Sequence, residues 1–214
     1  SILSMSSQIE ALNFFFLRHK DIEKEALKIG ITPLRYKRNQ STIDLNSQLK
    51  LLDSHVCIIG CGGLGGHVAE ILTRIGIGNL TLIDFDIFDE HNINRQNFSN
   101  YETIGKSKVL VVKENLEKIN PSIEINALIK EFDVTSDFNI ISKCDVIVDA
   151  LDNPKIKLAL AKVCKDNNIN FVHAAIAGMN GQFSSNNTLE NEYRNGSLGI
   201  EQMVGNPSFS VTFA

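Results

Sequence analysis

Residues 56–65 read VCIIGCGGLG, and this stretch decides the fold expected of the 214-residue chain. Its first four residues are apolar and predict a buried strand, while its glycines predict a tight turn into a helix. Glycine lets the backbone turn sharply, approach a phosphate closely and pack the helix against the strand. Phosphate oxygens at such a turn face the free N–H groups and the positive dipole end of the helix. The stretch therefore predicts a nucleotide site that includes Gly60, Gly62, Gly63 and Gly65.

An acidic residue follows at the end of the next apolar run. Leu80-Thr81-Leu82-Ile83 leads to Asp84, at about the position where a carboxylate hydrogen-bonds the ribose of a bound nucleotide. The structural alternative is a glycine-rich turn followed by a solvated aspartate at a strand end. Because the strand, the helix and the acid are all in place, we favour a nucleotide site. These residues alone do not separate NAD from ATP.

Short β-branched runs alternate with helical periodicity from Val56 onward, which is typical of βαβ units and a parallel sheet. Strands are predicted at 56–59, 80–84, 123–129, 145–151 and 171–176. Helices are predicted at 64–75, 106–119, 136–142 and 154–167. The expected fold class is α/β, with a Rossmann-like, mostly parallel sheet and helices on both of its faces. The last part of the chain, rich in Asn, Ser and Gly, predicts loop.

The segment before Val56 has a different character. Apolar residues recur at mostly helical spacing over residues 1–30, which predicts an amphipathic helix that Gly30 and Pro33 end. Residues 34–52 are polar and basic. We therefore expect an N-terminal helical and basic arm over residues 1–52 and a nucleotide-binding domain over residues 53–214. No linker is long enough to predict a second such domain.

Composition excludes several classes of protein. Hydrophobic residues make up 43% and charged residues 21% of the chain, as in ordinary globular proteins. A net charge of -4 argues against a general nucleic-acid binder. No apolar run has the length of a membrane span, and the N-terminus carries no secretory signal. The four cysteines are expected to be reduced thiols, which indicates a cytoplasmic protein. From the charge and the short apolar runs we expect that it binds neither nucleic acid nor membrane.

The segment after Asp84 favours ATP over NAD. Residues 84–96 are polar and charged, where a NAD-binding unit would enter a helix. Gly105-Lys106-Ser107-Lys108 then starts a helix, and Asp149–Asn153 follows at the carboxyl end of a strand. Ligands of open α/β sheets bind at that edge. Nucleotidyl transfer requires cations to balance phosphate charge and a carboxylate for Mg²⁺, and both are expected there.

Six motifs in this order resemble those of the ThiF/MoeB/HesA family, the bacterial relatives of ubiquitin-activating enzymes. The motifs are Arg35-Tyr36-Lys37-Arg38, Gly60–Gly65, Asp84-Phe85-Asp86, Asn92–Gln96, Gly105–Lys108 and Asp149–Asn153, and the resemblance runs from about Leu34 to Gln182. It implies an adenylyltransferase that uses ATP and Mg²⁺. Its substrate would be the terminal carboxylate of a small ubiquitin-like sulfur-carrier protein that ends in Gly-Gly. The acyl-adenylate would pass to a sulfur donor protein, for thiamine or a related cofactor.

The resemblance also implies roles for single residues around the nucleotide. Asp84 would hold the ribose, and Asn92, Arg95 and Gln96 would line the triphosphate. Lys108 would neutralise the α-phosphoryl group while the carboxylate attacks it.

Three further residues complete the implied site. Asp152 would bind Mg²⁺, and Arg38 would reach the phosphates of a neighbouring subunit, so that the working unit is a homodimer. Asp86 is either a second carboxylate beside the nucleotide or a loop cap. The expected catalytic set is therefore Lys108, Arg95 and Arg38.

The chain departs from the family pattern in its cysteines. Many members carry two CxxC pairs for a structural zinc after the fifth strand, whereas no cysteine follows Cys164 here. We therefore expect no zinc and no covalent thioester or persulfide link to the carrier. Members usually continue with a helix and further strands beyond the position of Ala214, so a further C-terminal part is expected.

Other residues of the motifs and their surroundings have ordinary structural interpretations. Asp149 is either a ligand or a structural partner inside an apolar strand. Surface or structural positions are expected for Arg35, Lys37, Lys106, His67, His91 and His173, and a core or dimer contact for Phe14–Phe16.

Three other functions stay open at this stage. The first is adenylation of a different carboxylate, on a peptide C-terminus or a modified tRNA base. The second is a NAD-dependent oxidoreductase, which the charged segment after Asp84 disfavours. The third is a non-catalytic nucleotide-binding scaffold, which the combination of Arg38, Arg95, Lys108 and Asp152 disfavours.

Overall fold

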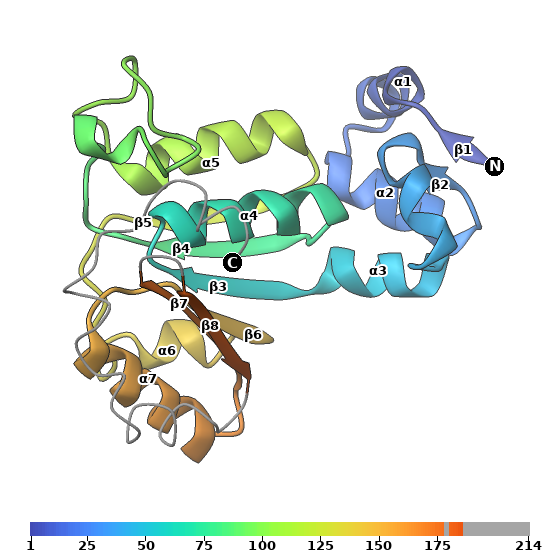
Figure 1. Cartoon of the computed structure of the whole chain (residues 1–214). Coiled ribbons are helices and arrows are strands. Elements are labelled where there is room, and N and C mark those ends of the chain that lie inside the picture. The colour runs from blue at the N-terminus through green and yellow to red at the C-terminus, as the bar shows by residue number, and fades with distance from the viewer. Residues whose placement is uncertain (178–179, 186–214) are drawn as a thin grey trace.

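A six-stranded sheet forms the centre of the computed structural model, which describes residues 1–177 and 180–185 (Figure 1). The strands are β3 (His55–Ile59), β4 (Asn79–Ile83), β5 (Glu124–Leu128), β6 (Val146–Asp149), β7 (Asn170–Ala177) and β8 (Asn180–Ser185). Their order is β5-β4-β3-β6-β7-β8, and all neighbours are parallel except β7 and β8. The expected mostly parallel sheet is therefore confirmed.

The order of the strands reverses next to β3. The chain runs from β3 through β4 to β5 and then returns to β6 on the other side of β3. Consequently Ile59 and Asp149, at the carboxyl ends of β3 and β6, lie beside each other in register. Such a reversal leaves a crevice at the carboxyl edge of an open α/β sheet, where ligands bind.

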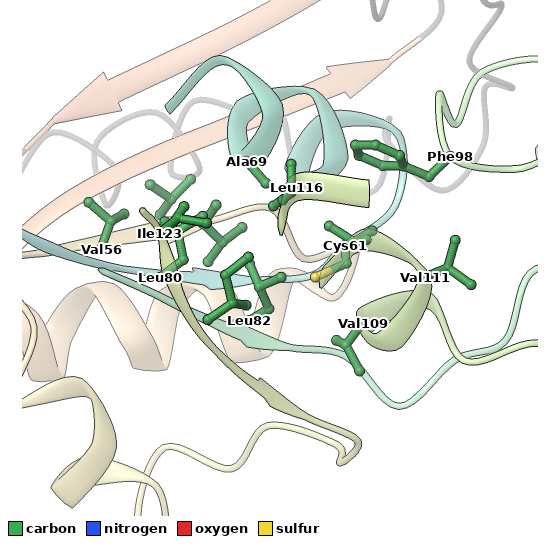
Figure 2. Close-up of a cluster of buried hydrophobic side chains, with 14 of the residues drawn as sticks. Val56, Cys61, Ala69, Leu80, Leu82, Phe98, Val109, Val111, Leu116 and Ile123 are labelled. Carbon is green, nitrogen blue, oxygen red and sulfur yellow. The ribbon is translucent and has the colours of Figure 1, made fainter. Parts of the chain in front are cut away.

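Helices cover both faces of the sheet (Figure 1). One face carries α4 (Gly63–Ile75) and α5 (Lys108–Ile119), and the other carries α6 (Phe138–Ile141) and α7 (Pro154–Asp166). Because successive side chains of a strand point to opposite faces, Val56 and Ile58 belong to the first core, while Cys57 and Ile59 belong to the second. Figure 2 shows the first core, which includes Leu80 and Leu82 of β4 and Leu116 of α5.

Several boundaries differ from the sequence predictions for identifiable reasons. The strand predicted to end at Leu151 ends at Asp149, because the Asp149 carboxylate accepts the Leu151 N–H and turns the chain. The helix predicted from Lys106 begins at Lys108, because Ser107 pairs with Ile87 in an isolated bridge. No strand was predicted after residue 176, whereas Asn180–Ser185 forms β8 and extends the sheet.

The N-terminal arm is more broken than its periodicity predicts. Residues 1–30 contain two helices, α1 (Met5–Phe15) and α2 (His19–Lys28), because Phe16 takes a left-handed conformation between them. Two short strands, β1 (Ile2–Leu3) and β2 (Thr32–Pro33), pair in parallel. The basic stretch forms η1 (Leu34–Ser41) and α3 (Leu45–Asp53). Phe14–Phe16 are exposed, so the expectation that they belong to the core of the chain is wrong, and a dimer contact stays a prediction.

The arm packs against the edge of the sheet opposite the crevice. Tyr36 is fully buried, and its hydroxyl accepts a hydrogen bond at 2.9 Å from Asn120, just beyond α5. Gln48 donates to the carbonyl of Ile75 at the end of α4, at 2.8 Å. Arg35 is largely buried and pairs with the carboxylate of Glu23. Since α4 and α5 end at the amino edge of the sheet, the arm lies there too, and the domain division after residue 52 stays a prediction.

The helices of the described residues include none that is both long and apolar enough to cross a membrane.

Candidate nucleotide-binding cleft

A cleft of about 590 Å³ opens at the carboxyl edge of the sheet, over the crevice between β3 and β6. Of the residues predicted for the site, it is lined by Gly60, Gly62, Gly63, Asp84, Asp86, Asn92, Arg95, Gln96, Lys108 and Asp152. The structure thus brings together residues that lie up to ninety-two positions apart in the sequence (from 60 to 152). Two predicted residues, Gly65 and Arg38, lie outside the lining of this cleft.

The glycine turn is closed by backbone contacts. Gly60 has φ +94, and a Cβ there would lie 2.5 Å from the carbonyl oxygen of Ala150. A Cβ on Gly65 would lie 1.8 Å from the carbonyl oxygen of Gly60. Both glycines are therefore needed for the close approach of α4 to the strands. Gly65 acts through this packing, which explains why it does not line the cleft itself.

Asp84 joins the glycine turn to the following loop. Its Oδ2 accepts the backbone N–H of Cys61 at 2.7 Å, and its Oδ1 accepts that of Asp86 at 2.8 Å. Each carboxylate oxygen retains a lone pair for a second donor. The geometry is thus compatible with a hydrogen bond from a ribose hydroxyl to this half-buried side chain.

The polar segment after Asp84 folds into a loop that borders the cleft. The loop contains one short helix, η2 (Glu90–Asn92). The Phe88 N–H donates to the Lys106 carbonyl and the Gly105 N–H donates to the Phe88 carbonyl, and these bonds hold the loop near the start of α5. Asn92 is buried, and its Oδ1 accepts the Asp89 N–H at 2.9 Å, so its side chain shapes the loop. Gln96 is also buried, and within the described residues its Oε1 has no hydrogen-bond partner. A buried amide oxygen in that state is suited to a ligand or a bound water.

The two cations predicted for the cleft, Lys108 and Arg95, have different surroundings. The Lys108 side chain is only 9% exposed, and its Nζ donates to Asp86 Oδ2 at 2.9 Å. Asp86 is therefore a carboxylate partner of the lysine. Arg95 is half-buried, and its guanidinium donates to the His91 carbonyl at 2.8 Å. Over residues 1–177 and 180–185 no carboxylate pairs with Arg95, which leaves its charge available to phosphate.

The two aspartates after β6 have different surroundings. Asp152 is exposed and lines the cleft, whereas Asp149 is fully buried and bonded to His173 and Lys157. The structure thus favours the structural interpretation of Asp149 over that of a ligand.

Sequence reasoning missed several residues that line the cleft, among them the segment Lys130-Glu131-Phe132. This segment follows β5, so the rule that ligands gather at the carboxyl ends of strands could have found it. Lys130 is already paired with the buried carboxylate of Asp137.

Comparisons with known proteins identify relatives of the chain. The model of the ThiF family matches residues 36–198. The tRNA threonylcarbamoyladenosine dehydratase of Haemophilus influenzae is 40% identical over 138 residues, which are 64% of this chain and 52% of that protein. The sulfur carrier protein ThiS adenylyltransferase of Escherichia coli is 34% identical over 151 residues, which are 70% of this chain and 60% of that protein.

A solved structure resembles the chain to a similar extent. It is the E. coli tRNA N6-threonylcarbamoyladenosine dehydratase in complex with ATP, with a TM-score of 0.66 and 30% sequence identity, covering 68% of this chain and 60% of that one. The chain therefore spans between about half and three fifths of the length of these relatives. The family match covers most of the chain, including every residue that lines the cleft, and we conclude that the chain belongs to the ThiF family.

Proposed function

We propose that the chain is the adenylation unit of an enzyme that transfers the adenylyl group of ATP to a carboxylate and releases pyrophosphate. One observation carries the proposal: Lys108, Arg95 and Asp152 line the same cleft as the glycine turn and Asp84. A dinucleotide oxidoreductase has no need of this combination of cations and carboxylate. An adenylyltransferase needs it, because negative charge builds up on the phosphates as they react.

In the proposed reaction, a carboxylate oxygen of the substrate attacks the α-phosphorus of ATP. A new P–O bond forms to the carboxylate, and the bond to the pyrophosphate oxygen breaks with its electron pair. No enzyme group forms a covalent bond. Lys108 balances the charge of the α-phosphoryl group and Arg95 that of the departing phosphates, so the chain acts by positioning and charge stabilisation.

The donor chemistry of the cleft fits a magnesium ion. Mg²⁺ prefers oxygen ligands and is commonly held by one or two carboxylates together with substrate phosphates and waters. Asp152 offers one exposed carboxylate, and in the part of the chain that the structure describes no side chain is bonded to it. When bound, the ion would supply further neutralisation of the triphosphate charge.

For the substrate we propose a small ubiquitin-like sulfur-carrier protein that ends in Gly-Gly, in sulfur transfer for thiamine or a related cofactor. The motif resemblance and the ThiS adenylyltransferase among the relatives support it. A modified tRNA base is the second candidate, supported by the 40% identity to a dehydratase that acts on such a base. The net charge of -4 favours the protein substrate.

Carrier-dependent exchange of pyrophosphate into ATP tests the proposed reaction. We expect exchange with the ThiS carrier and none with a ThiS whose terminal carboxylate is an amide, because the amide removes the attacking oxygen. Exchange that starts only with tRNA containing threonylcarbamoyladenosine would establish the second candidate. Absence of exchange with both, while ATP binds, would refute an adenylation unit for these substrates.

A second expected result is that the carrier forms no covalent bond to the enzyme. All four cysteines are buried and none lines the cleft. Burial raises the pKa of Cys61, beside the glycine turn, well above its ordinary value, so this thiol stays protonated at neutral pH. Hydrogen bonds from Cys57 and His55 lower the pKa of Cys144 to about 6, but Cys144 precedes β6 at the opposite edge of the sheet.

Mass spectrometry under non-reducing conditions, after incubation of enzyme, ATP and carrier, should therefore find only the free enzyme and the activated carrier. The matched sample contains dithiothreitol. An adduct on any of the four cysteines that disappears in the reduced sample would contradict this expectation.

A further inference from the structure

A fully buried cluster of charged and polar side chains lies beneath the turn that carries Asp152. Its members are Asp149 at the end of β6, Lys157 in α7 and His173 in β7. Strand pairing places His173 beside Asp149 in register. The His173 Nδ1–H donates to Asp149 Oδ2 at 2.8 Å, and Lys157 Nζ lies 3.5 Å from the same oxygen and 3.2 Å from the Ala174 carbonyl.

The other oxygen of Asp149 acts on the turn itself. Oδ1 accepts the backbone N–H of Leu151 at 3.0 Å, a local bond of the kind that fixes tight turns. On the far side of Asp152, the Asn153 side chain accepts the Lys155 N–H at 3.0 Å and caps α7. The backbone at Asp152 is thus held from both sides, at a position that lines the cleft.

We propose that His173 and Lys157 are positioning residues for Asp152. They fix the Asp149 carboxylate, which in turn fixes the turn that directs Asp152 toward a Mg²⁺–ATP complex. The inference rests on the proposed function, because the orientation of Asp152 matters only if the cleft binds a Mg²⁺–ATP complex.

The physical reason lies in the burial of Asp149. A carboxylate removed from water requires partners for both oxygens. Without the His173 donor, Asp149 would rotate toward Lys157, and this rotation would weaken its bond to the Leu151 N–H. Substitution of a residue that orients a metal ligand typically lowers metal affinity by about 10–100-fold.

The test compares two substitutions of similar polarity. In His173→Asn the side-chain amide N–H lies near the former place of Nδ1–H and can still donate to Asp149. In His173→Gln the amide reaches the former place of Nε2 instead. The measured quantity is the ratio of the ATP dissociation constants without and with Mg²⁺, obtained by calorimetry on the full chain, with Asp152→Asn as the reference for a lost metal ligand.

We expect the ratio for His173→Asn to stay within about threefold of the wild-type ratio. For His173→Gln we expect the ratio to fall by about tenfold, or to the value measured for Asp152→Asn. Thermal unfolding of each variant separates this effect from stability. If His173→Gln unfolds earlier but keeps the wild-type Mg²⁺ ratio, the cluster is only structural and the proposal is wrong. If Asp152→Asn also keeps that ratio, the metal role of Asp152 in the proposed function has failed as well.

A second pair of variants covers the case in which His173→Gln does not fold. Lys157→Arg keeps a cation beside Asp149 and should retain the Mg²⁺ ratio, whereas Lys157→Met removes the cation and should lower it. Equal ratios in these two variants would overturn the role of Lys157.

Discussion

Replacing Lys108 by methionine is expected to lower the rate of carrier-dependent ATP–pyrophosphate exchange by about 10²–10³-fold, the usual effect of removing a preorganised group that stabilises developing charge. ATP affinity should change far less, because the lysine acts mainly where charge increases on the way to the transition state. The side chain is nearly buried and already directed along the cleft wall by Asp86. Stability should change little, since Asp86 is half exposed and can be solvated once the lysine is gone.

Lys106→Met is the matched control for this substitution. Lys106 lies two residues earlier, is exposed and does not line the cleft. Its loss should leave exchange within about twofold of the wild-type rate, as for an ordinary surface substitution. A Lys108→Met variant that exchanges as fast as the Lys106→Met variant would remove Lys108 from the proposed mechanism.

Loss of Arg38 is expected to lower exchange by a similar factor of about 10²–10³, although Arg38 lies outside the cleft of its own chain. The residue is exposed on η1, which packs at the amino edge of the sheet. The role predicted for Arg38, at a phosphate of a neighbouring subunit, therefore requires the proposed homodimer. Bidentate, charge-assisted hydrogen bonds of arginine to phosphate are not reproduced by lysine, so Arg38→Lys should recover only part of the rate.

Mixing two inactive variants tests the shared site directly. A dimer of one Arg38→Ala subunit and one Lys108→Met subunit has one site that lacks both groups and one intact site. Random mixing of equal amounts should restore about a quarter of the wild-type rate, because half of the dimers are mixed and each has one working site. Mixed dimers that form and stay as inactive as either parent would show that Arg38 acts within its own subunit, or not at all.

The fold of the central sheet could be predicted because its signals are local. Residues 56–65 combine a strand, a turn and a helix start in ten positions, and the structure has all three there. The positions of Asp84 and Asp152 could also be predicted, because each residue follows a strand and a parallel topology places it at the carboxyl edge of the sheet.

Features that depend on contacts distant in the sequence could not be predicted in this way. The apolar periodicity of residues 1–30 continues across the break at Phe16, so it indicated one helix where the chain forms two. The pairing of His173 with Asp149 depends on the register of β6 with β7, which no local pattern reveals. Residues 186–214, predicted to be loop, lie outside the described residues.

Calorimetric titration of the chain with ATP and with NADH tests the central claim, a cleft built for a nucleoside triphosphate and Mg²⁺. We expect ATP to bind, its affinity to fall when Mg²⁺ is removed, and the Asp152→Asn variant to lose that Mg²⁺ dependence. NADH should show no comparable binding, because the loop after Asp84 places Arg95 and Gln96 at the cleft where a dinucleotide-binding unit would continue into a helix. Tight binding of NADH together with no binding of ATP would contradict the assignment of this cleft.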